Sequence, residues 1–204
     1  WTAFRSTFKD IIDAYENDAH KDLAKKAPIH EVVLDMVVHH SPDPKVAQVY
    51  RIPKIWHGDK ETELGKALMT CDPDGEPAFV VTKIVIDKHA GEVAAGRIFS
   101  GKFKPGQEVY MNMAKKKVRL QQVSVYKGAH RVALDEVYPG NIVGLVGLKG
   151  VFAGETVSVE VMEPFEAIKH IFEPVITKSI EANSSADLAK LVDILGQISK
   201  EDPS

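Results

Sequence analysis

The stretch GRIFSGKFKPGQEVY, residues 96–110, places a glycine at every fifth position, at Gly96, Gly101 and Gly106. It contains neither G-x-x-x-x-G-K-[ST] nor G-x-G-x-x-G, the glycine patterns that bind phosphates. The glycines therefore serve the backbone. Gly101 and Gly106 permit the positive φ that turns require, with Pro105 set for a type II turn. Gly96 lets a strand bend or a neighbouring backbone come close.

The residues around this stretch, 76–161, form short runs rich in β-branched side chains and separated by turn signals. Such spacing is typical of a closed antiparallel β-barrel. Within 117–126 the apolar residues change parity near Gln121 and Gln122, which predicts a β-bulge there. The expected strands, six or so, are 79–86, 92–99, 107–113, 117–126, 141–148 and 156–161.

Helical periodicity precedes the barrel. Apolar residues recur every three or four positions in residues 4–15, and again in 29–37 after Pro28, which suits the first turn of a helix. His39 and His40, followed by a Ser-Pro-Asp-Pro run, end this second helix. Residues 45–75 are predicted to be a polar, irregular connector with a short helix near 63–69. Two helices alone make a poor core, so they are expected to border a domain whose sheet is missing.

The C-terminal residues return to a mixed pattern. Residues 174–181 are predicted to form a strand, and Ser184 or Ser185 to cap a helix with an apolar stripe through 188–198. One strand and one helix cannot enclose a core. The fold class is therefore mixed α and β, with a central antiparallel barrel, N-terminal helices and a partial C-terminal βα unit. The predicted domains are 1–57, 58–161 and 162–204.

Composition is that of a globular protein, with 44% apolar and 27% charged residues among 204. No apolar run is long enough for a membrane helix, so no membrane association is expected. The single cysteine, Cys71, is predicted to fill space in a reducing compartment. Because the chain begins at Trp1 without an initiator methionine, we expect it to be part of a longer protein.

Charge is distributed unevenly. Residues 83–131 contain eleven Lys or Arg and three Asp or Glu, a local charge of +8 in a chain of net charge −3. Strand alternation predicts that Lys117 and Arg119 share a face opposite Val118 and Leu120. A basic segment of this kind indicates contact with phosphates, the alternative being a solvated barrel wall. The candidate RNA-contacting residues are Lys102, Lys104, Lys115, Lys116, Lys117 and Arg119.

No metal or catalytic site is predicted. Adjacent helical residues such as His39 and His40 point about 100° apart, which does not suit shared zinc ligation. The segment Asp72–Gly75 lacks the spacing and the closing glutamate of a calcium loop, and is predicted to be a turn. No Ser/His/Asp arrangement is supported by spacing.

Three stretches resemble the elongation factor 2 family of archaeal and eukaryotic translational GTPases. LAKKAPIHEVVLDMVVHHSPDP (residues 23–44) resembles the last helix of that family's GTPase domain. AGRIFSGKFKPGQEVY (95–110) resembles the barrel pattern shared by translational GTPases. EPVITKSIEANSSADLAKLVDILGQISKEDPS (173–204) resembles the first half of the following domain. The middle pattern belongs to the whole superfamily, whereas the outer two indicate elongation factor 2.

The resemblance implies an internal piece of a cytoplasmic GTPase that promotes ribosomal translocation. The family's phosphate loop, switch regions and N-K-x-D motif are absent from the sequence, so this chain is predicted to be neither an enzyme nor a nucleotide-binding unit. GTP and Mg²⁺ would belong to the parent protein. The implied partners are small-subunit ribosomal RNA, the missing GTPase sheet and the downstream domains of the parent.

Two alternatives stay open. The chain could come from another ribosome-associated or RNA-associated GTPase of the same superfamily, or it could be a free-standing RNA-binding β-barrel. An independent hydrolase has no support in the sequence.

Overall fold

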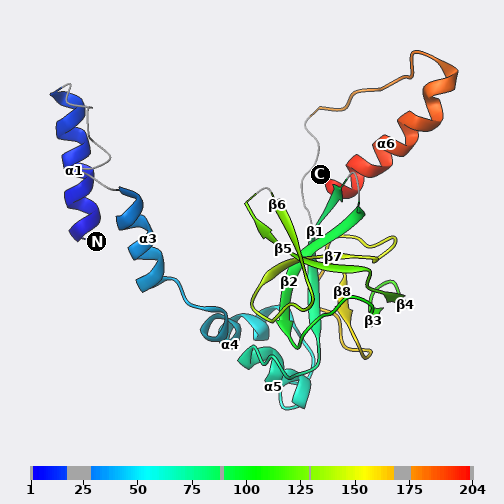
Figure 1. Ribbon diagram of the computed structural model, residues 1–204, viewed down its shortest axis with the longest axis horizontal. Coiled ribbons are helices and arrows are strands. Elements are labelled where there is room, and N and C mark those ends of the chain that lie inside the picture. Colours follow the sequence, from blue (N-terminus) through cyan, green and yellow to red (C-terminus); the bar gives the residue numbers. More distant parts are fainter. Residues whose placement is uncertain (1, 18–28, 88–89, 129, 168–175, 203–204) are drawn as a thin grey trace. The chain divides into compact units, whose positions relative to one another are not determined.

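The computed structural model describes residues 2–17, 29–87, 90–128, 130–167 and 176–202 (Figure 1). The chain divides into two compact units, residues 1–43 and 44–204, which are taken separately below. The predicted domain division at residues 57 and 161 stays a prediction. Among the residues described, no helix is long and apolar enough to span a lipid bilayer.

The first unit consists of α1 (Thr2–Glu16) and α3 (Ile29–His40), which contact each other. The two helices were predicted, and α3 ends at His40 as expected; Pro28 lies outside the described residues. None of the side chains of α3 is buried. The apolar stripe of α3 is therefore not covered by the residues that the structure describes.

The second unit opens with α4 (Pro44–Ile55) and α5 (Glu63–Thr70). The short helix was predicted as α5, but the expectation of an irregular connector before it was wrong, because α4 occupies that segment. Ala47, Gln48 and Ile52 of α4 are buried, and this burial stabilises a helix that includes Pro53 in its last turn. Packing against the barrel thus stabilises α4 although its local sequence favours a helix only weakly.

Eight antiparallel strands follow, arranged in the order β4-β3-β8-β1-β2-β7-β5-β6 (Figure 1). The mixed fold with a β-barrel is confirmed. The strands are β1 (Ala78–Asp87), β2 (Gly91–Ser100), β3 (Glu108–Met111), β4 (Lys116–Arg119), β5 (Gln122–Lys127), β6 (His130–Leu134), β7 (Ile142–Val146) and β8 (Thr156–Ser158).

The predicted long strand 117–126 is β4 and β5, joined at Leu120 and Gln121. The Leu120 amide donates to Gln107 O at 2.9 Å, and the Gln121 amide donates to Val146 O at 2.8 Å. At this junction the backbone is therefore hydrogen-bonded on one side to Gln107, just before β3, and on the other side to β7. This junction closes a ring of six strand positions, with β6 added outside as the partner of β5. The parity change marks a switch of pairing partner, not the predicted bulge.

The barrel interior forms one apolar cluster and its outer surface supports a second. Phe79, Ile98 and Phe103 are among the fully buried residues inside the barrel. The second cluster joins Ile52 of α4 and Trp56, the residue after that helix, to the outer surface of the barrel. It also includes the residues Leu68, Ala78, Val80, Phe99, Met162 and Phe165. The indole N–H of Trp56 donates to Glu163 O at 2.8 Å, which fixes the segment after β8 against α4.

The C-terminal helix was predicted and is α6 (Leu188–Glu201), preceded by a 3-10 turn that Ser184 caps. The strand predicted for residues 174–181 was wrong in its described part. Residues 176–181 carry no regular secondary structure, and residues 174–175 lie outside the described residues. A strand needs a hydrogen-bonding partner, and no described strand pairs with this segment.

Gly96 stands where β1 and β2 come closest. A Cβ atom at Gly96 would lie 1.9 Å from Val80 O and 2.7 Å from the ring of Phe79. Both neighbours belong to buried parts of the barrel, so neither can move aside cheaply. Gly101 and Gly106 have φ values of 65° and 81°, and the Gln107 amide donates to Lys104 O across the turn that contains Pro105.

Replacing Gly96 by alanine is expected to lower the free energy of unfolding by about 3 kcal/mol or more, because of this overlap. The matched control is Gly196→Ala in α6, where no atom lies within 4 Å of the new Cβ. That change should stabilise the helix by roughly 0.5–1 kcal/mol. Urea unfolding followed by circular dichroism measures both. Equal effects of the two substitutions would contradict the proposed close approach at Gly96.

Candidate nucleic-acid interface

The hairpin of β3 and β4 carries the most basic part of the sequence. Its register places Glu108 opposite Arg119 and Tyr110 opposite Lys117, so these four side chains share one face. Lys117 and Arg119 are exposed on that face, while Val118 is half-buried. This face of the hairpin therefore carries two cations, an aromatic ring and one carboxylate, that of Glu108.

A buried carboxylate fixes the loop between the two strands. Glu155 is fully buried, and its oxygens accept hydrogen bonds from the amides of Met113 at 2.8 Å, Ala114 at 3.0 Å and Thr156 at 3.0 Å. Lys115 follows with a φ of 53°, a left-handed conformation uncommon outside glycine. The basic residues at the hairpin tip thus extend from a backbone that is held rigidly.

Lys149 joins this region from a distant part of the sequence. The Lys116 ammonium donates to Lys149 O at 2.6 Å, which brings the loop after β7 beside β4. Both lysines are exposed. Sequence reasoning missed Lys149 because it lies outside the basic segment, and nothing local indicates which strand it approaches. We define the hairpin surface by the residues Lys115, Lys116, Lys117, Arg119 and Lys149.

The cations of the hairpin surface are not neutralised by ion pairs among the described residues. The Arg119 Nε donates to Gly106 O at 2.7 Å, which orients the guanidinium along the β3 side. Since this bond uses an uncharged acceptor, the positive charge stays available. The arrangement can bind phosphates, and Tyr110 adds a partly exposed ring beside Lys117.

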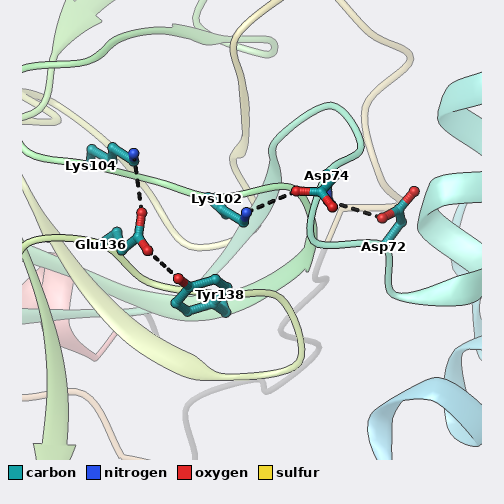
Figure 2. Close-up of polar contacts among 6 residues, drawn as sticks. All are labelled: Asp72, Asp74, Lys102, Lys104, Glu136 and Tyr138. Carbon is teal, nitrogen blue, oxygen red and sulfur yellow. Dashed lines mark hydrogen bonds and ion pairs between the residues drawn. The ribbon is translucent and has the colours of Figure 1, made fainter.

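Lys102 and Lys104, predicted with the others, lie in a separate network (Figure 2). The Lys102 ammonium pairs with Asp74 at 2.8 Å and stands 5.4 Å from the centre of the Tyr138 ring. Lys104 pairs with Glu136 at 3.1 Å, and the Tyr138 hydroxyl donates to the same carboxylate. The two lysines are therefore largely neutralised, and the structure does not join all six candidates into one site.

Hydrogen bonds in this network shift the pKa values of its members. The hydroxyl of Tyr138, and after it the ammonium of Lys104, lower the pKa of Glu136. The same bond to Glu136 raises the pKa of Tyr138, and the hydrogen bond to Asp74 raises the pKa of Lys102. These shifts favour the ionised carboxylate of Glu136, the charged ammonium of Lys102 and the neutral hydroxyl of Tyr138. The contribution of Glu136 is therefore present at neutral pH and is lost as the pH falls through its lowered pKa.

The acidic residues of the turn at 72–75 belong to the same network. Asp72 Oδ1 accepts a hydrogen bond from the Asp74 amide at 2.9 Å. The Asp74 carboxylate in turn accepts a hydrogen bond from the Lys102 ammonium. Cys71, buried just before it, adopts a φ of 56° at the end of α5. Within the described part of the chain no three His, Cys, Asp or Glu side chains are grouped to hold a metal ion.

Comparison with known proteins identifies the barrel first. Residues 76–160 match the model of elongation factor G domain 2, and this range contains all eight strands. The barrel is therefore a domain of a translation elongation factor.

The full chain has closer relatives. It is 54% identical over 200 residues to elongation factor 2 of Methanocaldococcus jannaschii, and 54% identical over 198 residues to that of Thermococcus kodakarensis. Each match covers 97% of this chain but only 28% and 27% of the relative. For elongation factor 2 of Methanopyrus kandleri, also 54% identical, the share is 16%. Over the segment it spans, the chain belongs to the elongation factor 2 family.

Removing the Glu155 carboxylate should destabilise the barrel. Glu155→Ala leaves three amides without an acceptor, and the expected loss in free energy of unfolding is on the order of 3 kcal/mol. The control is Glu108→Ala on the exposed face, which should change stability by less than about 0.5 kcal/mol. Chemical denaturation monitored by tryptophan fluorescence measures both. A loss no greater than that of the control would show that the loop does not depend on Glu155.

Removing the Tyr138 hydroxyl tests the neutralising network. In Tyr138→Phe the pKa of Glu136 is expected to rise toward its ordinary value, because the largest cause of the lowering is gone and only the two ammonium groups of Lys104 and Lys102 remain to lower it. Side-chain carboxyl shifts in an NMR pH titration report this directly. Tyr126→Phe serves as the control and should leave the pKa of Glu136 unchanged. An unaltered Glu136 titration in the Tyr138 variant would remove the hydroxyl from the network.

Proposed function

We propose that this segment docks a GTP-driven translocation factor on ribosomal RNA. The support is its membership of the elongation factor 2 family, together with the hairpin surface. The chain spans about a quarter of the length of the first two relatives, so the activity of the whole protein is part of the proposal. In this view the barrel contacts small-subunit RNA while other parts of the parent bind GTP and Mg²⁺ and hydrolyse the nucleotide.

The hairpin surface is the observation that carries this proposal. Five exposed cations gather at the tip of the β3–β4 hairpin, whose loop Glu155 holds, and at the adjacent loop after β7, and no described ion pair neutralises them. Phosphates that replace their counterions gain affinity mainly through counterion release, which makes binding salt-dependent. A solvated barrel wall would not need a rigid loop at its most basic point.

The remaining assignments follow from the family. We propose that the chain performs no catalysis and takes no cofactor of its own, because the sequence contains none of the family's nucleotide motifs. The uncovered apolar residues of α3 are then the side that meets the GTPase sheet of the parent. Action on ribosomes places the protein in the cytoplasm.

Salt-dependent RNA binding tests the proposal. Substituting Lys115, Lys117 and Arg119 together by alanine should weaken binding to small-subunit ribosomal RNA. Each lost phosphate contact should reduce the magnitude of the slope of log K against log salt by about 0.7–0.9, so a total reduction of about 2 is expected. Lys116 is retained because it holds the loop at Lys149. Filter binding or fluorescence anisotropy between low and physiological salt provides the measurement.

A control variant removes the same charge elsewhere. Lys45, Lys66 and Lys190 are exposed and lie outside the hairpin surface. Their combined replacement by alanine should lower affinity only slightly and keep the slope. If the hairpin variant keeps the original slope, or if both variants lose it equally, the hairpin surface is not the docking site.

A further inference from the structure

We propose that a cleft between α4 and the outer face of β1 and β2 binds a small aromatic anion. The cleft has a volume of about 520 Å³. Small-molecule sites typically measure about 300–1,000 Å³ and combine apolar walls with a few polar groups. None of its lining residues belongs to the hairpin surface, so the site is independent of RNA docking. The residues that carry the argument are Gln48, Arg51, Lys54, Arg97, Phe99 and Phe165.

Two unpaired polar atoms single out this cleft. Buried polar side-chain atoms in proteins almost always have hydrogen-bond partners. Across the described residues only two buried side-chain nitrogen or oxygen atoms lack one, and these are Gln48 Oε1 and Arg97 Nε. Both residues line the same cleft. Their coincidence there indicates a site whose ligand supplies one hydrogen-bond donor, for Gln48 Oε1, and one acceptor, for Arg97 Nε–H.

The orientation of Gln48 is fixed by its surroundings. The Nε2 group donates to Phe99 O at 2.9 Å and also to Leu68 O. Both neighbours are backbone carbonyls, which can only accept, so the amide cannot be reversed. Gln48 is 1% exposed, and its Oε1 is left as a buried acceptor without a donor. The same residue therefore anchors α4 on the barrel and leaves a polar atom for the cleft.

Arg97 supplies the matching cation. Its guanidinium carbon stands 5.8 Å from the centre of the Phe99 ring, and its Nε–H has no acceptor among the described residues. The guanidinium fork binds carboxylate or phosphate through two parallel hydrogen bonds. A single oxyanion could satisfy Nε–H and a neighbouring N–H together. This selects an anion in preference to a neutral ligand.

The walls and rim complete the description of the ligand. The rings of Phe99 and Phe165 stack with centroids 4.8 Å apart at an angle of 25°, and both residues contribute to the apolar wall of the cleft. Arg51 and Lys54 lie three residues apart on α4 and are exposed at the cleft. With Glu166 as the one carboxylate among the lining residues, the cleft has an excess of two positive charges. A flat ring that carries a phosphate or carboxylate, together with an N–H or O–H that donates to Gln48 Oε1, fits these features.

Three probes separate the contributions of ring and anion. Phenyl phosphate contains both, phenol the ring alone, and inorganic phosphate the anion alone. Titration of the full chain, followed by amide NMR, should show phenyl phosphate binding at least about tenfold more tightly than either part, a difference of 1.4 kcal/mol. The largest shifts are expected at Ala47, Thr82 and Phe165. Benzoate, titrated in parallel, identifies whether carboxylate or phosphate is the preferred oxyanion.

Surface variants test the site without disturbing the core. Arg51→Ala combined with Lys54→Ala should weaken phenyl phosphate binding about fivefold, whereas the control pair Lys45→Ala and Lys66→Ala should leave it unchanged. Arg97→Lys keeps the charge but loses the fork, and should weaken binding further. The proposal is overturned if phenol binds as tightly as phenyl phosphate, if no probe binds, or if both charge-removal pairs have the same effect. Because the hairpin surface is intact in all variants, loss here is distinguishable from loss of RNA docking.

Discussion

Closure of the barrel at Leu120 and Gln121 is the constraint on which the other features depend. Two consecutive amides bond in opposite directions, to Gln107 O and Val146 O, and so complete the ring of strands. The approach is tight enough that Gly147, with a φ of 110°, must lack a side chain, since a Cβ there would lie 2.6 Å from Arg119 O. Closure removes exposed strand edges from the ring and sets β4 beside the loop that carries Lys149. The hairpin surface is therefore a consequence of how the sheet closes.

A buried carboxyl group orders the hairpin loop without neutralising the cations of the hairpin surface. Glu155 is satisfied by three amides, so it fixes the hairpin loop without forming an ion pair with any described lysine. An exposed carboxylate in the same place would instead have neutralised the cations, as Glu136 and Asp74 do for Lys104 and Lys102. Lys102 and Lys104 are therefore paired with carboxylates, whereas the lysines of the hairpin surface are not, a difference that the sequence alone does not reveal.

Local patterns predicted what depends on local geometry. Alternation located six strands and separated Lys117 and Arg119 from Val118, because side-chain direction along a strand has a period of two. The same pattern could not distinguish a bulge from a change of partner at Gln121, since both reverse parity. The helix α4 was missed because its burial depends on Phe99 and Phe165, far away in the sequence. For the same reason, the sequence could not predict the pairing of Lys104 with Glu136 or the contact of Lys149 with Lys116.

The alternation of β1 and β2 also explains how one barrel can support two separate surfaces. Phe79 and Ile98 point inward and belong to the cluster that supports the hairpin, while Val80 and Phe99 point outward and form the floor under α4. Each strand thus contributes one face to the barrel interior and the other to the cleft. Gln48 and Glu155 fix these two regions through separate hydrogen bonds to the backbone. Since the two sets share no side chain, substitutions in the cleft can change its surface while the hairpin surface stays unchanged.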